Sequence, residues 1–111
     1  MRYGNAIKEV RATGGYRLHV VFKDQYIGEV DLWPLFEKPR GPLTEVFQDP
    51  AFFAKVFVDL DAAAWPNGYD IDPDVLRYYC DIGRVCTREE LAAAFAQPDL
   101  SPITLNDKQN L

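Results

Sequence analysis

The chain has 111 residues, of which 48% are hydrophobic and 26% are charged, and its formal net charge is −5. This length suits one domain with a single core. An aromatic content of 14% argues against a disordered chain. No apolar run approaches the roughly 20 residues that a membrane-spanning helix needs, and the N-terminus lacks the apolar stretch of a secretory signal. We therefore expect a cytoplasmic protein without a membrane segment.

The negative charge is concentrated in the later part of the chain. Residues 41–111 hold twelve Asp and Glu against five Lys and Arg, whereas residues 1–40 hold five against seven. Affinity for nucleic acid depends on cations that neutralise phosphates, and no cluster of Lys and Arg stands out. The charge therefore argues against DNA or RNA as a direct partner.

Cysteine and histidine are too scarce for a structural zinc site, which needs about four ligands. Cys80, Cys86 and His19 are the chain's complete set of these residues. We expect both cysteines to be reduced thiols and His19 to lie on the polar face of a strand. The sequence predicts no cofactor.

The first third of the chain predicts an antiparallel meander. Residues 6–12 form a short strand, Thr13-Gly14-Gly15 turns the chain, and a third strand covers residues 26–32. The second strand alternates apolar and mostly polar residues, and its predicted core face comprises Tyr16, Leu18, Val20 and Phe22. Asp24-Gln25 is the predicted hairpin turn. Because glutamine resists a positive φ, a loop longer than two residues or a bulge is expected there.

Short elements follow the meander. We expect a helical turn at residues 33–36 and a short helix that begins at Asp49-Pro50. β-Branched and aromatic residues predict a strand over 55–60, and another short strand is expected at 64–65. We expect both later strands to extend the meander.

The stretch from Trp65 to Tyr79 carries the strongest structural signals. Pro66-Asn67-Gly68 is turn chemistry beside an aromatic core residue, and Asp72-Pro73 reads as an N-cap and first helical residue. The main helix is predicted over residues 73–82 and stops at Gly83. Its predicted inward stripe is Val75, Leu76, Tyr79 and Ile82, and its predicted outward or sideways residues are Arg77, Tyr78, Cys80 and Asp81.

Thr87-Arg88-Glu89-Glu90 is a capping box for a last helix over residues 88–97. The predicted fold class is therefore α+β, a small antiparallel sheet (meander plus later strands) with two C-terminal helices, one of them packed on the sheet. We expect one domain over residues 1–97, followed by an extended or flexible tail over residues 98–111.

The chain resembles the bacterial family known as domain of unknown function 2442 (DUF2442). The resemblance covers about residues 6–79, and its most specific part is Trp65-Pro66-Asn67-Gly68. Further matching segments are Tyr16-Arg17-Leu18, Gly28-Glu29-Val30-Asp31-Leu32, Asp49-Pro50, Val58-Asp59 and Pro73-Asp74-Val75-Leu76. The family has no assigned activity. Fusions of some members to a helix-turn-helix imply a regulatory role, and the neighbouring genes of others imply an antitoxin-like role.

This sequence departs from the family pattern in two places. Gln25 stands where the family favours glycine, and the residues after 80 are too few for a helix-turn-helix.

Asp70, Asp72 and Asp74 imitate the start of a calcium loop, because alternate carboxylates can converge on one cation. The pattern then fails, since Val75 stands where such a loop needs glycine. Capping of the main helix and complementation of its dipole are the alternative roles of these carboxylates. We expect no metal site here.

Three function classes remain. We expect a non-catalytic module that binds another protein, and we place its contact surface at Tyr69, Asp70, Asp74 and Tyr78. A DNA-linked transcriptional regulator without its own helix-turn-helix is one alternative. A metal-dependent hydrolase that uses Asp70, Asp72 and Asp74 is the other. No recognisable set of catalytic residues supports an enzyme. A homo-oligomer is compatible with the sequence.

Overall fold

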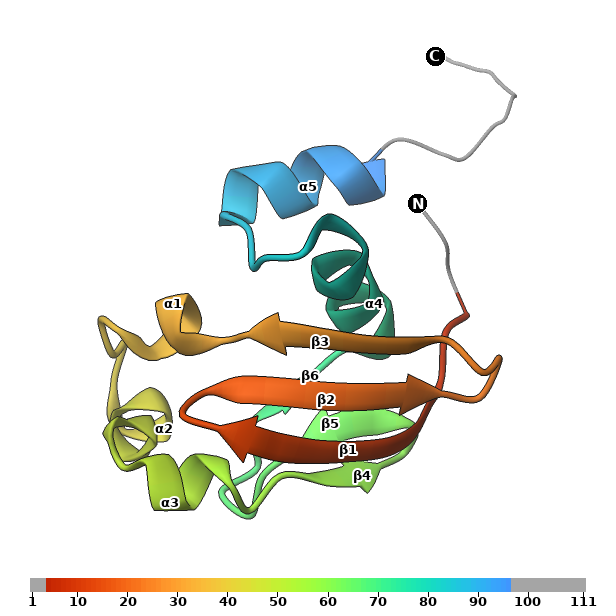
Figure 1. The fold of residues 1–111 in the computed structure, drawn as a ribbon. Helices are drawn as coiled ribbons and strands as arrows, with labels where there is room; N and C mark the ends of the chain where they lie inside the picture. The colour runs from red at the N-terminus through yellow and green to blue at the C-terminus, as the bar shows by residue number, and fades with distance from the viewer. Residues whose placement is uncertain (1–3, 97–111) are drawn as a thin grey trace.

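The computed structural model describes residues 4–96 and places them in an α+β fold (Figure 1). The strands are β1 (Ile7–Gly14), β2 (Arg17–Phe22), β3 (Ile27–Asp31), β4 (Phe57–Asp59), β5 (Ala62–Ala64) and β6 (Asp70–Ile71). The helices are α1 (Trp33–Phe36), α2 (Pro42–Glu45), the 3-10 helix η1 (Val46–Gln48), α3 (Pro50–Phe53), α4 (Pro73–Ile82) and α5 (Arg88–Ala96). The predicted fold class is confirmed.

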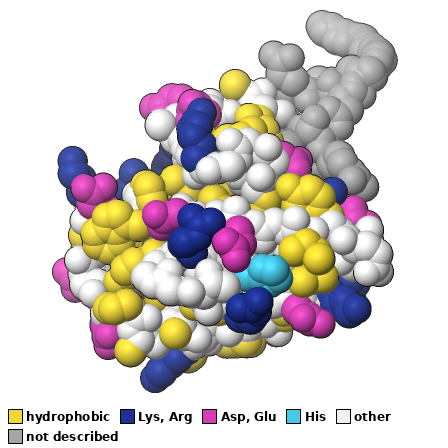
Figure 2. Space-filling model, viewed as in Figure 1, with side chains coloured by type: hydrophobic (Ala, Val, Ile, Leu, Met, Phe, Trp, Pro, Cys, Tyr) yellow, Lys and Arg dark blue, Asp and Glu magenta, His cyan; other side chains and the backbone are white. Residues whose placement is uncertain are grey.

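The first sheet is the predicted meander, with strand order β1-β2-β3 and antiparallel pairing throughout. Leu18, Val20 and Phe22 are fully buried, and Tyr16 packs half-buried against the same core. The predicted register of β2 is therefore correct. The opposite face carries His19 among charged side chains, and Figure 2 shows this face.

The loop between β2 and β3 is longer than two residues, as the glutamine predicted. Phe22 N–H donates to the carbonyl of Tyr26 at 2.8 Å, which leaves three residues in the loop. The last of these, Gln25, has a φ of 78°, in the left-handed region that favours glycine. This left-handed conformation explains why the family favours glycine at this position.

The later strands form a second sheet, with order β4-β5-β6, and do not extend the meander. The two sheets meet at β1, where Ile7 N–H donates to the carbonyl of Asp61 at 2.9 Å. The pairing of β1 with β2 is irregular near both ends of β1, and such irregularities bend a strand. β4 lies beside β1, but the two strands belong to separate sheets. The two-residue β6 was not predicted.

An aromatic cluster fills the core beside the second sheet. Trp65 is 1% exposed, and its Nε1–H donates to the carbonyl of Phe53 at 2.8 Å. The rings around it belong to Phe47, Phe53 and Tyr69. Asn67 Oδ1 accepts from Tyr69 N–H at 3.1 Å, so the Pro66-Asn67-Gly68 turn holds Tyr69 against the cluster.

The main helix, α4, packs beside β3, as predicted (Figure 1). Leu76 and Tyr79 are buried, Val75 is half-buried, and Ile82 at the end of the stripe is exposed. Asp72 caps the helix by accepting from Asp74 N–H at 2.8 Å, and Gly83 ends it with a φ of 79°. Gly28 of β3 allows the close approach, because an added Cβ would lie 2.8 Å from Cys80.

The last helix, α5, begins with the predicted capping box. Thr87 Oγ1 accepts from Glu90 N–H at 3.0 Å, and a Glu90 carboxylate oxygen accepts from Thr87 N–H at 2.9 Å. Tyr78 and Phe95 join α4 to α5 with rings 6.5 Å apart. The predicted end of this helix at Gln97 and the predicted tail over residues 98–111 lie outside the described residues.

Candidate functional site

The four residues of the predicted partner surface each contact a different neighbour. Tyr69 is half-buried in the aromatic cluster, and Tyr78 packs on Phe95. Asp74 is bound to Asn5, whereas Asp70 is exposed on β6. Both tyrosines are half-buried, so each would offer only part of its ring to a partner.

The carboxylates of the Asp70, Asp72 and Asp74 series have separate roles. Asp72 is the helix cap, and Asp74 Oδ1 accepts from the backbone N–H and the side-chain amide of Asn5 at 2.8 and 2.9 Å. These bonds turn the two carboxylates toward N–H donors, not toward a shared cation. Among residues 4–96, no group of three His, Cys, Asp or Glu side chains is placed to hold a metal ion.

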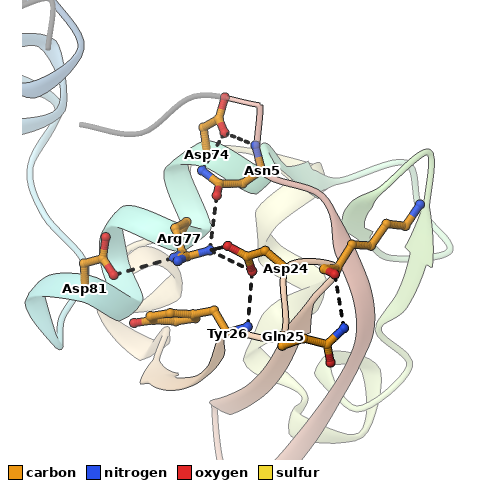
Figure 3. Close-up of polar contacts among 8 residues, drawn as sticks. Asn5, Asp24, Gln25, Tyr26, Asp74, Arg77 and Asp81 are labelled. Carbon is orange, nitrogen blue, oxygen red and sulfur yellow. Dashed lines mark hydrogen bonds and ion pairs between the residues drawn. The ribbon is translucent and has the colours of Figure 1, made fainter. Parts of the chain in front are cut away.

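Arg77 was predicted to face outward or sideways, and this was wrong. It is 5% exposed, and its guanidinium lies over the ring of Tyr26 at 3.7 Å and over that of Phe22 at 5.1 Å. Its Nη1 donates to Asp24 at 3.0 Å and to Asn5 at 3.2 Å (Figure 3). The helical pattern alone could not reveal this position, because the stabilising partners come from residues more than 50 positions earlier in the chain.

These contacts collect Asp24, Asp61, Asp74 and Asp81 at one end of the molecule. Asp59 precedes the turn that holds Asp61, and we call the five carboxylates together the acidic end. Lys23 Nζ lies 2.7 Å from Asp61, and Arg77 Nε lies 3.7 Å from Asp81. Five carboxylates against these two cations leave the acidic end with a net negative charge. The sequence signal was the density of aspartate over residues 59–81, and the fold adds Asp24 from the β2–β3 loop.

An exposed leucine projects from this end. Leu60 and Asp61 form the two-residue turn between β4 and β5, with φ values of 49° and 67°. Leu60 is 91% exposed, the largest exposed fraction among the large apolar side chains described. A left-handed conformation costs a residue with a Cβ about 1 kcal/mol, so glycine or asparagine would serve the turn better. The fold therefore gains nothing from leucine at this position.

The thiols and the histidine show no sign of an activated nucleophile. Burial raises the pKa of Cys80 to about 11, and burial also raises the pKa of Cys86. Both are free thiols. His19 Nδ1 lies 3.5 Å from Glu29, whose own pKa is lowered chiefly by the hydrogen bond from Arg17. His19 therefore lies opposite Glu29 of the neighbouring strand, on the face where it was predicted.

The fold is similar to that of a solved bacterial protein. The crystal structure is that of a “Putative DNA Binding Protein” from Nitrosomonas europaea ATCC 19718, with a TM-score of 0.54 and 21% sequence identity. The match covers 86% of this chain and 62% of the Nitrosomonas chain, so this chain spans less than two thirds of that protein. No curated protein matches the sequence.

Two further observations concern membrane-spanning helices and family membership. None of the helices in residues 4–96 has both the length and the apolar character needed to cross a membrane. The model of the family described as “Protein of unknown function (DUF2442)” matches residues 7–81, which include every strand and nearly all of α4. The chain therefore belongs to the DUF2442 family, as its Trp-Pro-Asn-Gly segment indicated.

Proposed function

We propose that this chain is a non-catalytic protein-binding module whose contact surface is the acidic end, with Leu60 as its apolar anchor. The observation that carries the proposal is the exposed leucine held at positive φ between two aspartates. Outliers of this kind are retained where something outside the fold uses them. Buried apolar anchors supply most of the energy of protein interfaces, and a charged surround steers the partner.

The negative charge around Leu60 indicates which kind of partner the surface would bind. Asp59 and Asp61 flank Leu60, and the neighbouring β2–β3 loop adds Asp24. Such a surface favours a basic protein with an apolar pocket and repels nucleic acid at low ionic strength. An antitoxin-like or regulatory role would be one form of this function. The free thiols of Cys80 and Cys86 support a cytoplasmic location.

The test compares partner capture by the wild-type full chain and two variants of it. Leu60→Gly removes the anchor, and Ile27→Ala removes another exposed apolar side chain, 62% exposed on β3, as the matched control. We expect Leu60→Gly to reduce capture of a specific protein from host lysate at least tenfold and Ile27→Ala to leave it unchanged. Photo-crosslinking from position 60 should then identify the same protein, and added salt should weaken capture.

Folding serves as the internal control for this test. Leu60→Gly removes the strain at position 60, so its free energy of unfolding should be equal to that of the wild type or up to about 1 kcal/mol higher. Urea denaturation measures this. Equal capture by Leu60→Gly and wild type would exclude Leu60 as the anchor, and the proposal would fail.

A DNA-linked regulator is the second candidate, favoured by the fold shared with the Nitrosomonas protein. In the described chain, α5 begins with Arg88, Glu89 and Glu90, and two carboxylates against one guanidinium suit phosphate contact poorly. Under this alternative, DNA contact would come from a partner or from further domains. Recovery of specific DNA fragments in the same capture experiment, with Leu60→Gly as effective as wild type, would favour it.

A further inference from the structure

A groove of about 820 Å³ lies away from the acidic end, between the α1–α2 segment and the junction of α4 and α5. Its apolar walls are Pro34, Leu35, Val85 and Leu91. Polar side chains of three kinds complete the lining: hydroxyls, a thiol and charged groups. The polar groups that lie deepest determine what the groove could bind.

Two phenol groups without protein partners open on the groove. Tyr79 is 3% exposed and Tyr69 is half-buried, and both line the groove. Among residues 4–96, neither phenol oxygen takes part in a hydrogen bond. Within the same residues, the one side-chain N or O atom that is sealed from solvent and lacks a partner is Nε of Arg77. The Tyr79 hydroxyl is therefore accessible from the groove, on a side chain that is otherwise buried.

These hydroxyls are hydrogen-bond donors at neutral pH. Burial raises the pKa of Tyr79 to about 12, with smaller contributions from Cys86 and Tyr69, which places these three groups close together. Burial likewise raises the pKa of Tyr69, the Asp70 carboxylate raises it further, and the Arg40 guanidinium lowers it. Of these two charged residues, Arg40 lines the groove and Asp70 does not, so the groove presents protonated phenols together with a cation.

The charged rim is more positive than the rest of the molecule. Lys38, Arg40 and Arg88 line the groove against Glu37 and Glu89, although the whole chain has a net charge of −5. No ion pair engages these three cations among the described residues. Paired phenol donors with a nearby guanidinium complement an anionic acceptor, and the apolar walls complement a hydrocarbon body.

We propose that this groove binds a small organic carboxylate with an apolar body, the carboxylate meeting Tyr69, Tyr79 and Arg40. The proposal concerns binding alone, and burial raises the pKa of the Cys86 thiol in the lining. This site is independent of the protein-binding proposal, since none of its lining residues belongs to the acidic end or to the β4–β5 turn.

The test is an amide-resolved NMR titration of the full chain with three ligands of one shape: hexanoate, hexanamide and hexylamine. We expect hexanoate to shift the amide signals of groove residues with saturation, and we expect hexanamide to bind about tenfold more weakly because it lacks the charge. Equal binding of hexanoate and hexanamide would overturn the proposal. So would the absence of saturable shifts at ligand concentrations up to about 10 mM, the weak limit for a specific small site.

Variants assign the binding to the named groups. Tyr79→Phe removes one hydroxyl and Arg40→Gln removes the rim charge from an exposed loop, and each should weaken hexanoate binding about tenfold. Tyr78→Phe, which loses a hydroxyl outside the groove, is the matched control and should bind as wild type does. Unchanged affinity in both Tyr79→Phe and Arg40→Gln would refute the site. If inorganic phosphate competed as strongly as hexanoate, the apolar walls would have no role and the carboxylate proposal would be wrong.

Discussion

Trp65 connects the family's most specific segment to the core. Its indole is 1% exposed among the rings of Phe47, Phe53 and Tyr69, and its N–H satisfies the carbonyl of Phe53. The fold thus depends on one large side chain that both fills space and pairs a buried backbone group.

Replacing this residue should be costly. Trp65→Ala leaves a cavity and an unpaired Phe53 carbonyl, so we expect the free energy of unfolding to fall by about 3–5 kcal/mol. Trp65→Phe keeps most of the volume and should cost clearly less. Urea denaturation followed by circular dichroism measures both, and a loss below about 1 kcal/mol in Trp65→Ala would contradict the packing described.

Arg77 stabilises the fold through shape as well as charge. Its planar guanidinium stacks on Tyr26 while Nη1 reaches Asp24, a combination that an ammonium group cannot reproduce. Arg77→Lys should therefore lower the free energy of unfolding by about 1–2 kcal/mol although the charge is kept. The exposed Arg11→Lys on β1 is the control and should change stability little. Equal melting temperatures for the wild type and Arg77→Lys would show that stacking contributes nothing.

At the scale of elements, α5 depends on a titratable cap. The hydrogen bond from Arg84 and that from Thr87 lower the pKa of Glu90 from 4.5 to about 2. A carboxyl whose pKa is lower in the folded state stabilises that state above its ordinary pKa, and the contribution disappears as pH falls toward the folded value.

We therefore expect the start of α5 to fray between pH 4.5 and about 2. Amide hydrogen exchange at residues 87–91 reports this change. Glu90→Gln keeps a capping side chain but cannot ionise, so the protection factors of these amides, which are exchange rates corrected for the intrinsic effect of pH, should not change in this variant over the same window. Fraying that is identical in both proteins would assign the effect to other carboxyls.

Local signals predicted the elements better than their assembly. The Asp-Pro helix starts, the Gly83 stop, the capping box and the alternation of β2 are short-range patterns, and the structure confirms each of them. The second sheet could not be predicted, because the alternation of residues in a strand does not specify which strand it pairs with. In the sequence, Gly28 is an ordinary glycine within a strand. Its role depends on the tertiary contact with Cys80 of α4, which leaves no room for a Cβ.

At the scale of the molecule, the sequence predicted a negative surface, and the fold determines which carboxylates come together. Asp70 and Asp74 are close in sequence, whereas folding binds Asp74 to Asn5 and brings Asp24 beside Arg77. For Leu60, the sequence could predict only that it lies in or next to a turn, because its φ and its exposure are properties of the folded chain. The groove could not be predicted either, because Tyr69, Tyr79 and Arg40 line one groove only in the folded chain.

The bond between Asn5 and Asp74 joins residues 69 positions apart, and this has a consequence for folding kinetics. Both sheets consist of hairpins between neighbouring segments, which close early, whereas a contact across such a long loop forms late. Asn5→Ala should therefore speed unfolding and leave the refolding rate nearly unchanged, a φ-value near zero, as stopped-flow chevron plots would reveal. A slower refolding limb would instead place the docking of α4 on the N-terminal segment in the folding nucleus.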